Sequence, residues 1–296
     1  MSKKIVTLFL SLLMVFCLTA ATAESITLTD MFDREVVLTG PVTRVVVMEP
    51  GDCEILCALG CEDALVGRGL YCDYPASVLE LPAVQSAGDV NLEELLALEP
   101  QVVVTSGMAQ YEHLAAMLEA NGVRVVATNA NSIAELYEAI RLLGSVMGKT
   151  AEAEAVIADM QATFDDIAAK SGKTDKTICF EVMPLEWGLW TAGTGTFMTE
   201  LAEMCGMKNA FADIEGWQAI SQEQVIERNP DHIVLVTGMG ESAADEVMSR
   251  AGWTDMNAVR NAEVYNADSY TMTRPAPRLK EAAIDLYNFL NDIEAE

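Results

Sequence analysis

Aromatic side chains in segments expected to form loops are the residues of this chain best suited to bind a ligand. Flat rings suit a large, partly apolar ligand such as a macrocycle or an aryl chelate. Loops at the carboxyl ends of parallel strands form the usual ligand crevice of α/β proteins. A single aromatic residue is more often a packing residue, so the prediction of a ligand-binding surface rests on the set as a whole. The set consists of Tyr71, Tyr74, Trp187, Trp190, Trp217 and Tyr270.

A second candidate for ligand contact is the segment Arg274-Pro-Ala-Pro-Arg278, which carries two arginines between prolines. A guanidinium recognises carboxylate or phosphate through a bidentate fork. We therefore expect Arg274 to contact the ligand, and an anionic ferric chelate fits that expectation.

Catalytic and bare-metal sites are disfavoured by the scarcity of histidine. The chain has two, His113 on a polar helix and His232 at the start of a strand, and both are expected to be exposed. A zinc site needs several facing His, Cys or carboxylate ligands. Motifs for a serine nucleophile, a phosphate loop or a zinc protease do not occur. Gly193-Thr194-Gly195 fits a turn before a helix that starts near Thr196. We expect no catalytic residue, no metal ligand and no intrinsic cofactor.

Cysteines are the remaining reactive side chains, and their interpretation stays open. Three of them recur at every fourth residue, which places them on one stripe of a helix. The stripe fits a metal or redox site, or small hydrophobes on a core face, and the second interpretation is favoured. The disulfide state is not predicted. The six cysteines that follow residue 23 are Cys53, Cys57, Cys61, Cys72, Cys179 and Cys205.

Two glutamates, Glu93 and Glu223, each occupy the second position of a predicted short helix. The helix dipole favours a carboxylate there, which is a sufficient structural reason. The alternative is that the chain forms two lobes and that each lobe presents one of these acids to a partner with two basic sites. The motif alone leaves both interpretations open.

The N-terminus indicates export. Lys3 and Lys4 precede an apolar run, Ile5 to Leu18, and Ala21-Thr22-Ala23 is a cleavage site, so residues 1–23 are predicted to be a signal peptide. Ala21 stands where a lipoprotein signal would need cysteine, which favours free secretion over a lipid anchor. The net charge of -27 argues against a nucleic-acid partner and against anionic lipid.

Strand and helix patterns predict an α/β fold of two lobes with mainly parallel central sheets. Val102–Ser106 and Val123–Thr128 are Val-rich without alternation, as in strands covered on both faces. Apolar and polar residues alternate over 25–40, which predicts a hairpin with a turn near Asp33. Asp52 is expected to cap a helix that runs to Gly60. Ser132 is expected to open another helix with a capping box.

One long helix is expected to join the lobes. Ala151 to Lys170 contains neither Gly nor Pro, and at about 1.5 Å per residue it is roughly 30 Å long, the width of a small domain. The predicted organisation is 24–147 for the N-terminal lobe, 148–172 for the interlobe helix and 173–296 for the C-terminal lobe.

An internal echo, meaning a sequence pattern that occurs once in each half of the chain, supports two lobes of similar structure. Residues 91–104 and 221–234 share a capping residue, a glutamate, a short amphipathic helix, a proline and a buried strand. A second echo relates Glu54–Gly60 to Glu200–Gly206.

These segments together resemble the class III solute-binding proteins of ABC importers, which carry cobalamin, ferric siderophores and haem. In the N-terminal half the resemblance rests on RVVVMEPGDCEILCALGCEDALVGRGLYCDYP and NLEELLALEPQVVV. In the other half it rests on LWTAGTGTFMTELAEMCGMKNAFADIEGW, ISQEQVIERNPDHIVLV and RPAPRL. The sequence departs from the family pattern at Ala21 and in RPAPR, where RPGPR is frequent.

The resemblance implies a monomeric, non-enzymatic protein on the outer side of the cell membrane. Its ligand, a cobalt corrinoid or a ferric chelate, is expected between the lobes, near Tyr71, Tyr74, Trp190 and Trp217. Glu93 and Glu223 are expected to dock on arginines of an ABC permease, which works with its ATPase. Haem is a third candidate ligand. The competing classes are a chelatase-like enzyme and an exported sensor or scavenger without a transporter.

Overall fold

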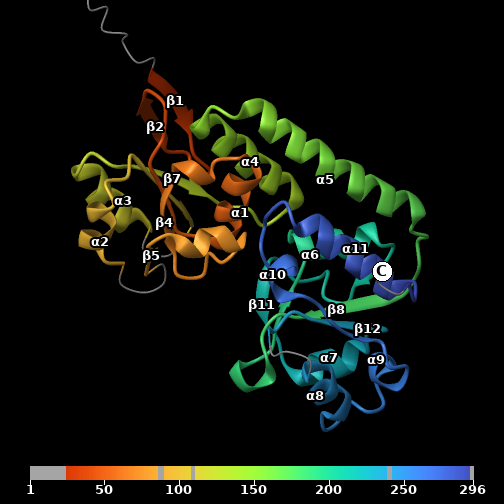
Figure 1. Ribbon diagram of the computed structural model, residues 1–296. Coiled ribbons are helices and arrows are strands. Elements are labelled where there is room, and N and C mark those ends of the chain that lie inside the picture. Colours follow the sequence, from red (N-terminus) through yellow and green to blue (C-terminus); the bar gives the residue numbers. More distant parts are fainter. Residues whose placement is uncertain (1–24, 86–89, 108–110, 239–241, 294–296) are drawn as a thin grey trace, which may run out of the picture.

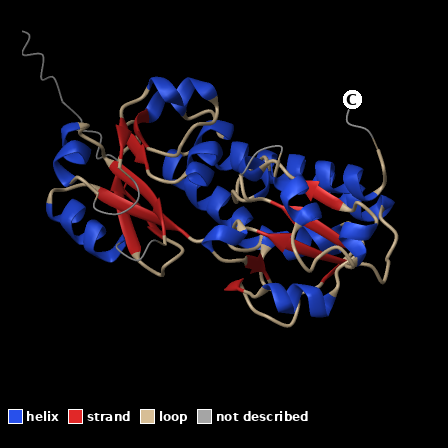
Figure 2. Cartoon of the chain, turned by 90° about the horizontal axis from the view of Figure 1, so that it is seen from below, coloured by secondary structure: helices blue, strands red, loops and turns tan. Residues whose placement is uncertain are grey.

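The computed structural model describes residues 25–85, 90–107, 111–238 and 242–293, and the predicted signal peptide lies outside them. The chain forms two lobes, and helix α5 (Thr150–Lys170) spans from one to the other (Figure 1). Figure 2 shows the two main sheets in separate halves of the molecule, each flanked by helices. The predicted two-lobed α/β fold is confirmed, while the exact domain bounds stay a prediction.

The N-terminal lobe is built on a parallel sheet of five strands in the order β5-β4-β3-β6-β7. The middle strand pairs with β6 from Val45 against Val102 to Val47 against Val104. All of these valines are fully buried, as the absence of alternation predicts. The strands are β3 (Val45–Val47), β4 (Leu65–Gly69), β5 (Ala83–Val84), β6 (Val102–Ser106) and β7 (Arg124–Thr128); the helices are α1 (Pro50–Ala58), α2 (Leu92–Ala97), α3 (Tyr111–Ala120) and α4 (Ile133–Met147), with short 3-10 turns at Glu62–Ala64 and Ala76–Glu80.

A small hairpin precedes this sheet, as the alternation predicts. Its strands β1 (Ser25–Thr29) and β2 (Glu35–Thr39) pair antiparallel, and Asp33 in the turn has a φ of 59°. The side chain of Asp30 accepts hydrogen bonds from the backbone N–H groups of Phe32 and Arg34, each at 3.0 Å, which fixes the turn.

The C-terminal lobe contains a four-stranded parallel sheet in the order β10-β8-β12-β13 and a two-stranded antiparallel sheet, β11-β9. Its strands are β8 (Thr177–Glu181), β9 (Trp190–Ala192), β10 (Lys208–Asn209), β11 (Trp217–Ala219), β12 (His232–Leu235) and β13 (Val264–Asn266). Its helices are α6 (Phe197–Met204), α7 (Gln222–Arg228), α8 (Ala243–Ser249), α9 (Asn257–Arg260), α10 (Ser269–Met272) and α11 (Leu279–Leu290), with a 3-10 turn at Leu185–Trp187.

Helix α5 packs through one narrow stripe. Its buried residues recur at intervals of four and three positions, and they face α4 of one lobe and α11 of the other. They are Ala153, Ile157, Met160, Phe164 and Ile167. Because the helix has no internal Gly or Pro, it holds the lobes as a stiff strut. Within the described part of the chain, no helix is long and apolar enough to cross a membrane.

The helix caps and the cysteine stripe were predicted from short sequence segments, and the structure confirms one cap and contradicts the other. Ser132 forms the predicted capping box with Glu135. The prediction for Asp52 is wrong: Pro50 occupies the first turn, so the cap falls on Glu49 and Asp52 lies buried inside the helix. Helix α1 ends at Ala58, so Cys61 lies beyond it and the three cysteines do not share one helix. All six described cysteines are free thiols.

The prediction that His232 is exposed is also wrong. Its side chain is 2% exposed, with Nδ1 3.2 Å from a carboxylate oxygen of Glu263 and the ring edge-on to Phe289. Burial lowers the pKa of His232, more than Glu263 raises it. His232 begins β12, a strand that is buried along its whole length, and the residue type alone does not reveal this.

Candidate functional site

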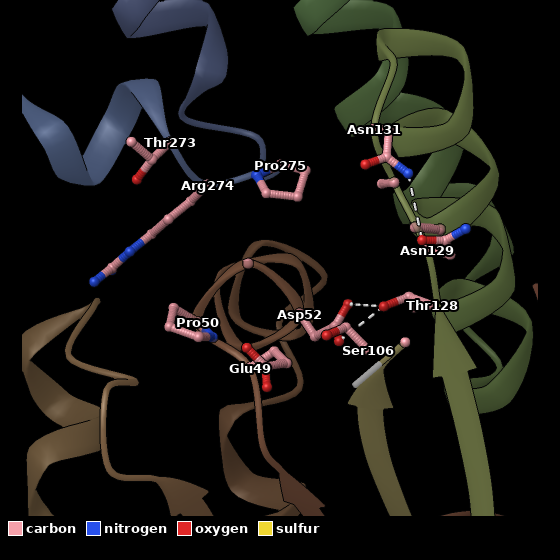
Figure 3. A pocket seen from close by; sticks show the side chains of 14 residues that line it. Glu49, Pro50, Asp52, Ser106, Thr128, Asn129, Asn131, Thr273, Arg274 and Pro275 are labelled. Atoms are coloured by element: carbon pink, nitrogen blue, oxygen red, sulfur yellow. Dashed lines mark hydrogen bonds between the residues drawn. The ribbon is translucent and has the colours of Figure 1, made fainter. Parts of the chain in front are cut away.

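A cavity of about 420 Å³ lies between the lobes. The N-terminal lobe lines it with residues at the carboxyl ends of β3, β6 and β7, and the C-terminal lobe lines it with Thr273, Arg274 and Pro275 (Figure 3). This is the edge at which parallel sheets bind ligands. The two lobes come very close here: a Cβ added at Gly51 would lie 2.9 Å from the backbone oxygen of Pro275.

Two carboxylates form the floor of the cavity. Asp52 is 4% exposed, and its two oxygens accept a hydrogen bond from Thr128 Oγ1 at 2.9 and 3.0 Å. Burial raises the pKa of Asp52 to about 8, against the lowering effect of Thr128, and neighbouring Glu49 raises it further. Burial likewise raises the pKa of Glu49 to about 7.

Neutral polar side chains complete the N-terminal wall. Ser106 and Asn129 line the cavity, and Asn131 Nδ2 donates to Asn129 Oδ1 at 3.4 Å. Asn131 also links the lobes, because its backbone oxygen accepts from Phe197 N at 2.6 Å and its Oδ1 accepts from Trp217 Nε1 at 3.4 Å. Trp217 is therefore held at the lobe junction, with its ring centroid 5.5 Å from that of Phe197.

The guanidiniums of the RPAPR segment are paired with carboxylates of the opposite lobe. Arg274 donates to Glu54 at 3.1 Å and to Asp73 at 2.6 Å. Arg278 donates two bonds to Glu54, both at 2.8 Å. Arg274 also stacks over the Tyr270 ring at 4.7 Å, and Arg278 over the Tyr74 ring at 3.7 Å. In Figure 3 the Arg274 side chain extends away from Asp52 and Thr128.

The predicted aromatic residues lie outside the cavity wall, and all but the half-buried Trp217 are exposed. Tyr71, Tyr74 and Tyr270 gather around the two arginines, and the backbone oxygen of Tyr71 accepts from Arg274 at 3.5 Å. Trp187 and Trp190 are exposed on the C-terminal lobe, Trp187 by 70%. Of the predicted ligand-binding residues that the structure describes, Arg274 alone contributes to the lining.

The polar residues with which the N-terminal lobe lines the cavity were missed by sequence reasoning, although they carry a sequence signal. Glu49, Ser106 and Thr128 each stand at the end of a Val-rich strand, where the chain leaves the sheet. Because the three strands are adjacent and parallel, these ends meet at one edge. A polar residue at the end of a buried strand therefore predicts this part of the cavity lining better than residue type alone does.

Glu93 and Glu223 are both exposed at the second position of their helices, as predicted. Asn91 caps α2 by accepting from Glu93 N, and Ser221 forms a capping box with Gln224 in α7. The pKa of Glu223 is lowered by its own backbone N–H and by Ser221. Helices α2 and α7 contribute to different cores from the one that α5 joins, so both cover sheet faces turned away from α5.

Comparison with known proteins identifies the family. Residues 45–271 match the model of a family described as periplasmic binding protein. The chain is 32% identical over 270 residues to the uncharacterized ABC transporter substrate-binding lipoprotein YvrC of Bacillus subtilis, covering 88% of this chain and 84% of that protein. It is 26% identical to the vitamin B12-binding protein of Vibrio cholerae, covering 84% and 90%.

A solved structure of similar fold comes from Staphylococcus epidermidis, described as a possible iron-binding (periplasmic solute-binding) protein. It has 27% identity and a TM-score of 0.75, and the match covers 84% of this chain and 98% of that one. The agreement extends over both lobes and the helix between them, and the relatives are binding proteins and not enzymes. The chain therefore belongs to the periplasmic binding protein family, as an exported substrate-binding protein of an ABC transporter.

Proposed function

We propose that this protein captures a metal chelate, a corrinoid or a ferric chelate, between its lobes and delivers it to an ABC permease with its ATPase. The observation that carries the proposal is the open interlobe cavity of about 420 Å³, whose walls come from both lobes. Ligand pockets span about 300–1,000 Å³, so the cavity is large enough to hold part of a macrocyclic chelate at this junction.

The relatives support this ligand class. One binds vitamin B12 by its description and another is described as possibly iron-binding. Exposed Trp187 and Trp190 supply flat surface on the C-terminal lobe for a part of the chelate that projects from the cavity. Haem is the third candidate, since the described residues at the cavity wall include neither His nor Tyr as an axial ligand.

Docking on the permease is assigned to Glu93 and Glu223. The two acids occupy equivalent helix positions in the two lobes, and both are exposed to solvent. A carboxylate on each lobe suits a membrane partner that presents two arginine sites. We propose that one protein molecule, acting as a monomer, meets the permease through both.

The ligand is tested by isothermal titration of residues 24–296 with cobalamin, cobinamide, ferric hydroxamates, ferric catecholates and haem. One chelate class is expected to bind at a stoichiometry of one with a Kd in the micromolar range or below, a binding free energy of at least about 8 kcal/mol. If none of the chelates binds while an unrelated small solute does, the chelate proposal is wrong.

A further inference from the structure

We infer that the cleft selects its cargo by the hydrogen-bonding character of the ligand's rim. Glu49 and Asp52 accept N–H donors from amide or ammonium groups, and they disfavour chelates whose rim carries carboxylates. The inference rests on the proposed function, because it specifies which chelates the interlobe cavity takes. Glu49 and Asp52 thereby become specificity-determining residues.

The two carboxylates have lost water without gaining enough donors. A carboxylate has about four lone-pair sites, whereas Asp52 receives its side-chain hydrogen bond from Thr128. Among the described residues, none donates a hydrogen bond to the side chain of Glu49, which lies partly buried at the same floor. Since an undersupplied buried acceptor costs about 1–3 kcal/mol, a ligand that brings donors recovers that energy.

The cleft offers no free cation to a ligand carboxylate. Arg274 is the one basic residue among the described lining residues, and Glu54 and Asp73 already hold its guanidinium. Figure 3 shows that guanidinium turned away from Asp52. At pH 8, where the Glu49 carboxyl is mostly ionised and that of Asp52 is about half ionised, a ligand carboxylate entering the floor would face negative charge without a cationic partner. Like-charge contact across an interface costs several kcal/mol.

The remaining wall is compatible with an amide rim. Ser106, Asn129 and Asn131 carry groups that both donate and accept, so they can bond the carbonyl oxygens of amides whose N–H groups face the acids. At longer range, the net charge of -27 lowers the local concentration of anionic ligands. The floor, the wall and the negative net charge of the protein therefore all favour a ligand with an amide rim over one with a carboxylate rim.

Two matched pairs of chelates isolate this property. Dicyanocobyrinic acid heptaamide and dicyanocobyrinic acid share one corrin ring and differ in bearing amides or carboxylates. Ferrioxamine B and its N-succinyl derivative share one ferric hydroxamate core and differ in ending in an ammonium or a carboxylate. Titration calorimetry at pH 8 would measure the Kd of each member for the wild type, for Glu49→Gln/Asp52→Asn, and for Glu62→Gln, an exposed acid beyond the far end of α1.

The donor-bearing member of a bound pair is expected to bind at least about 30-fold more tightly than its carboxylate counterpart. Glu49→Gln/Asp52→Asn should reduce that ratio to below about 5-fold, because amides accept and donate, while Glu62→Gln should keep it. Equal or tighter binding of the carboxylate member overturns the inference. Tight binding of haem, with its two propionates, while neither pair binds overturns it too and leaves the proposed function standing. Absence of binding by every chelate removes both.

Discussion

Glu54 and Glu200 hold equivalent places in the two lobes, and each carboxylate crosses to the opposite lobe. Glu54 begins the echo segment on α1, and its carboxylate forms ion pairs with Arg274 and Arg278. Glu200 begins the other on α6, and its Oε2 accepts from Ile133 N at the start of α4 at 2.6 Å. The lobes are therefore joined on both sides of the cleft as well as through α5, which limits how far they can open.

Removal of the Glu54 carboxylate is expected to destabilise the junction. The Glu54 side chain is 2% exposed and holds two guanidiniums, and breaking a buried pair by removing one partner costs about 3–5 kcal/mol. Denaturant unfolding of Glu54→Ala should show a loss of that size. The control Glu62→Ala, at an exposed acid, should change stability by less than about 0.5 kcal/mol. A loss below about 1 kcal/mol for Glu54→Ala would show that the ion pairs add little.

Neutralising Asp52 is expected to stabilise the protein at alkaline pH. Burial raises the Asp52 pKa from 3.8 to about 8, so the folded state binds a proton that the unfolded state releases in between. Stability therefore falls as pH rises through that window and stays low above it. Asp52→Asn keeps an acceptor for Thr128 and removes this cost.

Thermal melts of the wild type and Asp52→Asn at pH 5, 7 and 9 check the sign. The advantage of the variant should grow with pH, to about 2–5 kcal/mol at pH 9. An advantage that is constant with pH, or largest at pH 5, contradicts a raised pKa for Asp52.

Loss of the two docking acids is expected to reduce uptake without changing ligand binding. Glu93 and Glu223 are exposed and outside the cavity, so Glu93→Ala/Glu223→Ala should leave the Kd of the purified protein within about 2-fold. Uptake in cells should drop at least about 10-fold, the equivalent of 1.4 kcal/mol of docking energy. Glu94→Ala/Glu227→Ala removes exposed acids from the same two helices and serves as the control. Undiminished uptake by the first variant would favour a sensor or scavenger without a transporter.

The fold was accessible from sequence because its signals are local. Val102–Ser106 was predicted at its observed bounds, and α5 was predicted to within one residue, since each depends on a pattern within one segment. Asp52 was misassigned as a cap because Pro50, two positions earlier, sets the start of α1. The N-cap of α1 is set by the residue at which the chain passes from β3 into the helix. The residue types near that boundary are compatible with more than one N-cap.

The site was less accessible because its members meet only through the tertiary fold. Tyr74, which was predicted to contact the ligand, stacks with Arg278, about 200 positions away in the opposite lobe. Arg274 was predicted to bind an anion of the ligand, and its carboxylate partners Glu54 and Asp73 lie in the other lobe. Sequence indicates which residues are available, whereas pairing across the cleft decides which of them remain free.

The most direct test of ligand capture between the lobes is to fill the cavity. Asn129 is exposed and lines it, so Asn129→Trp adds bulk there without disturbing a core. Gln161→Trp, on the exposed face of α5, adds the same side chain elsewhere. Calorimetric titration with the chelate that the wild type binds should show at least about 100-fold weaker binding for Asn129→Trp and unchanged binding for Gln161→Trp. Wild-type affinity in a folded Asn129→Trp would contradict binding of the chelate between the lobes.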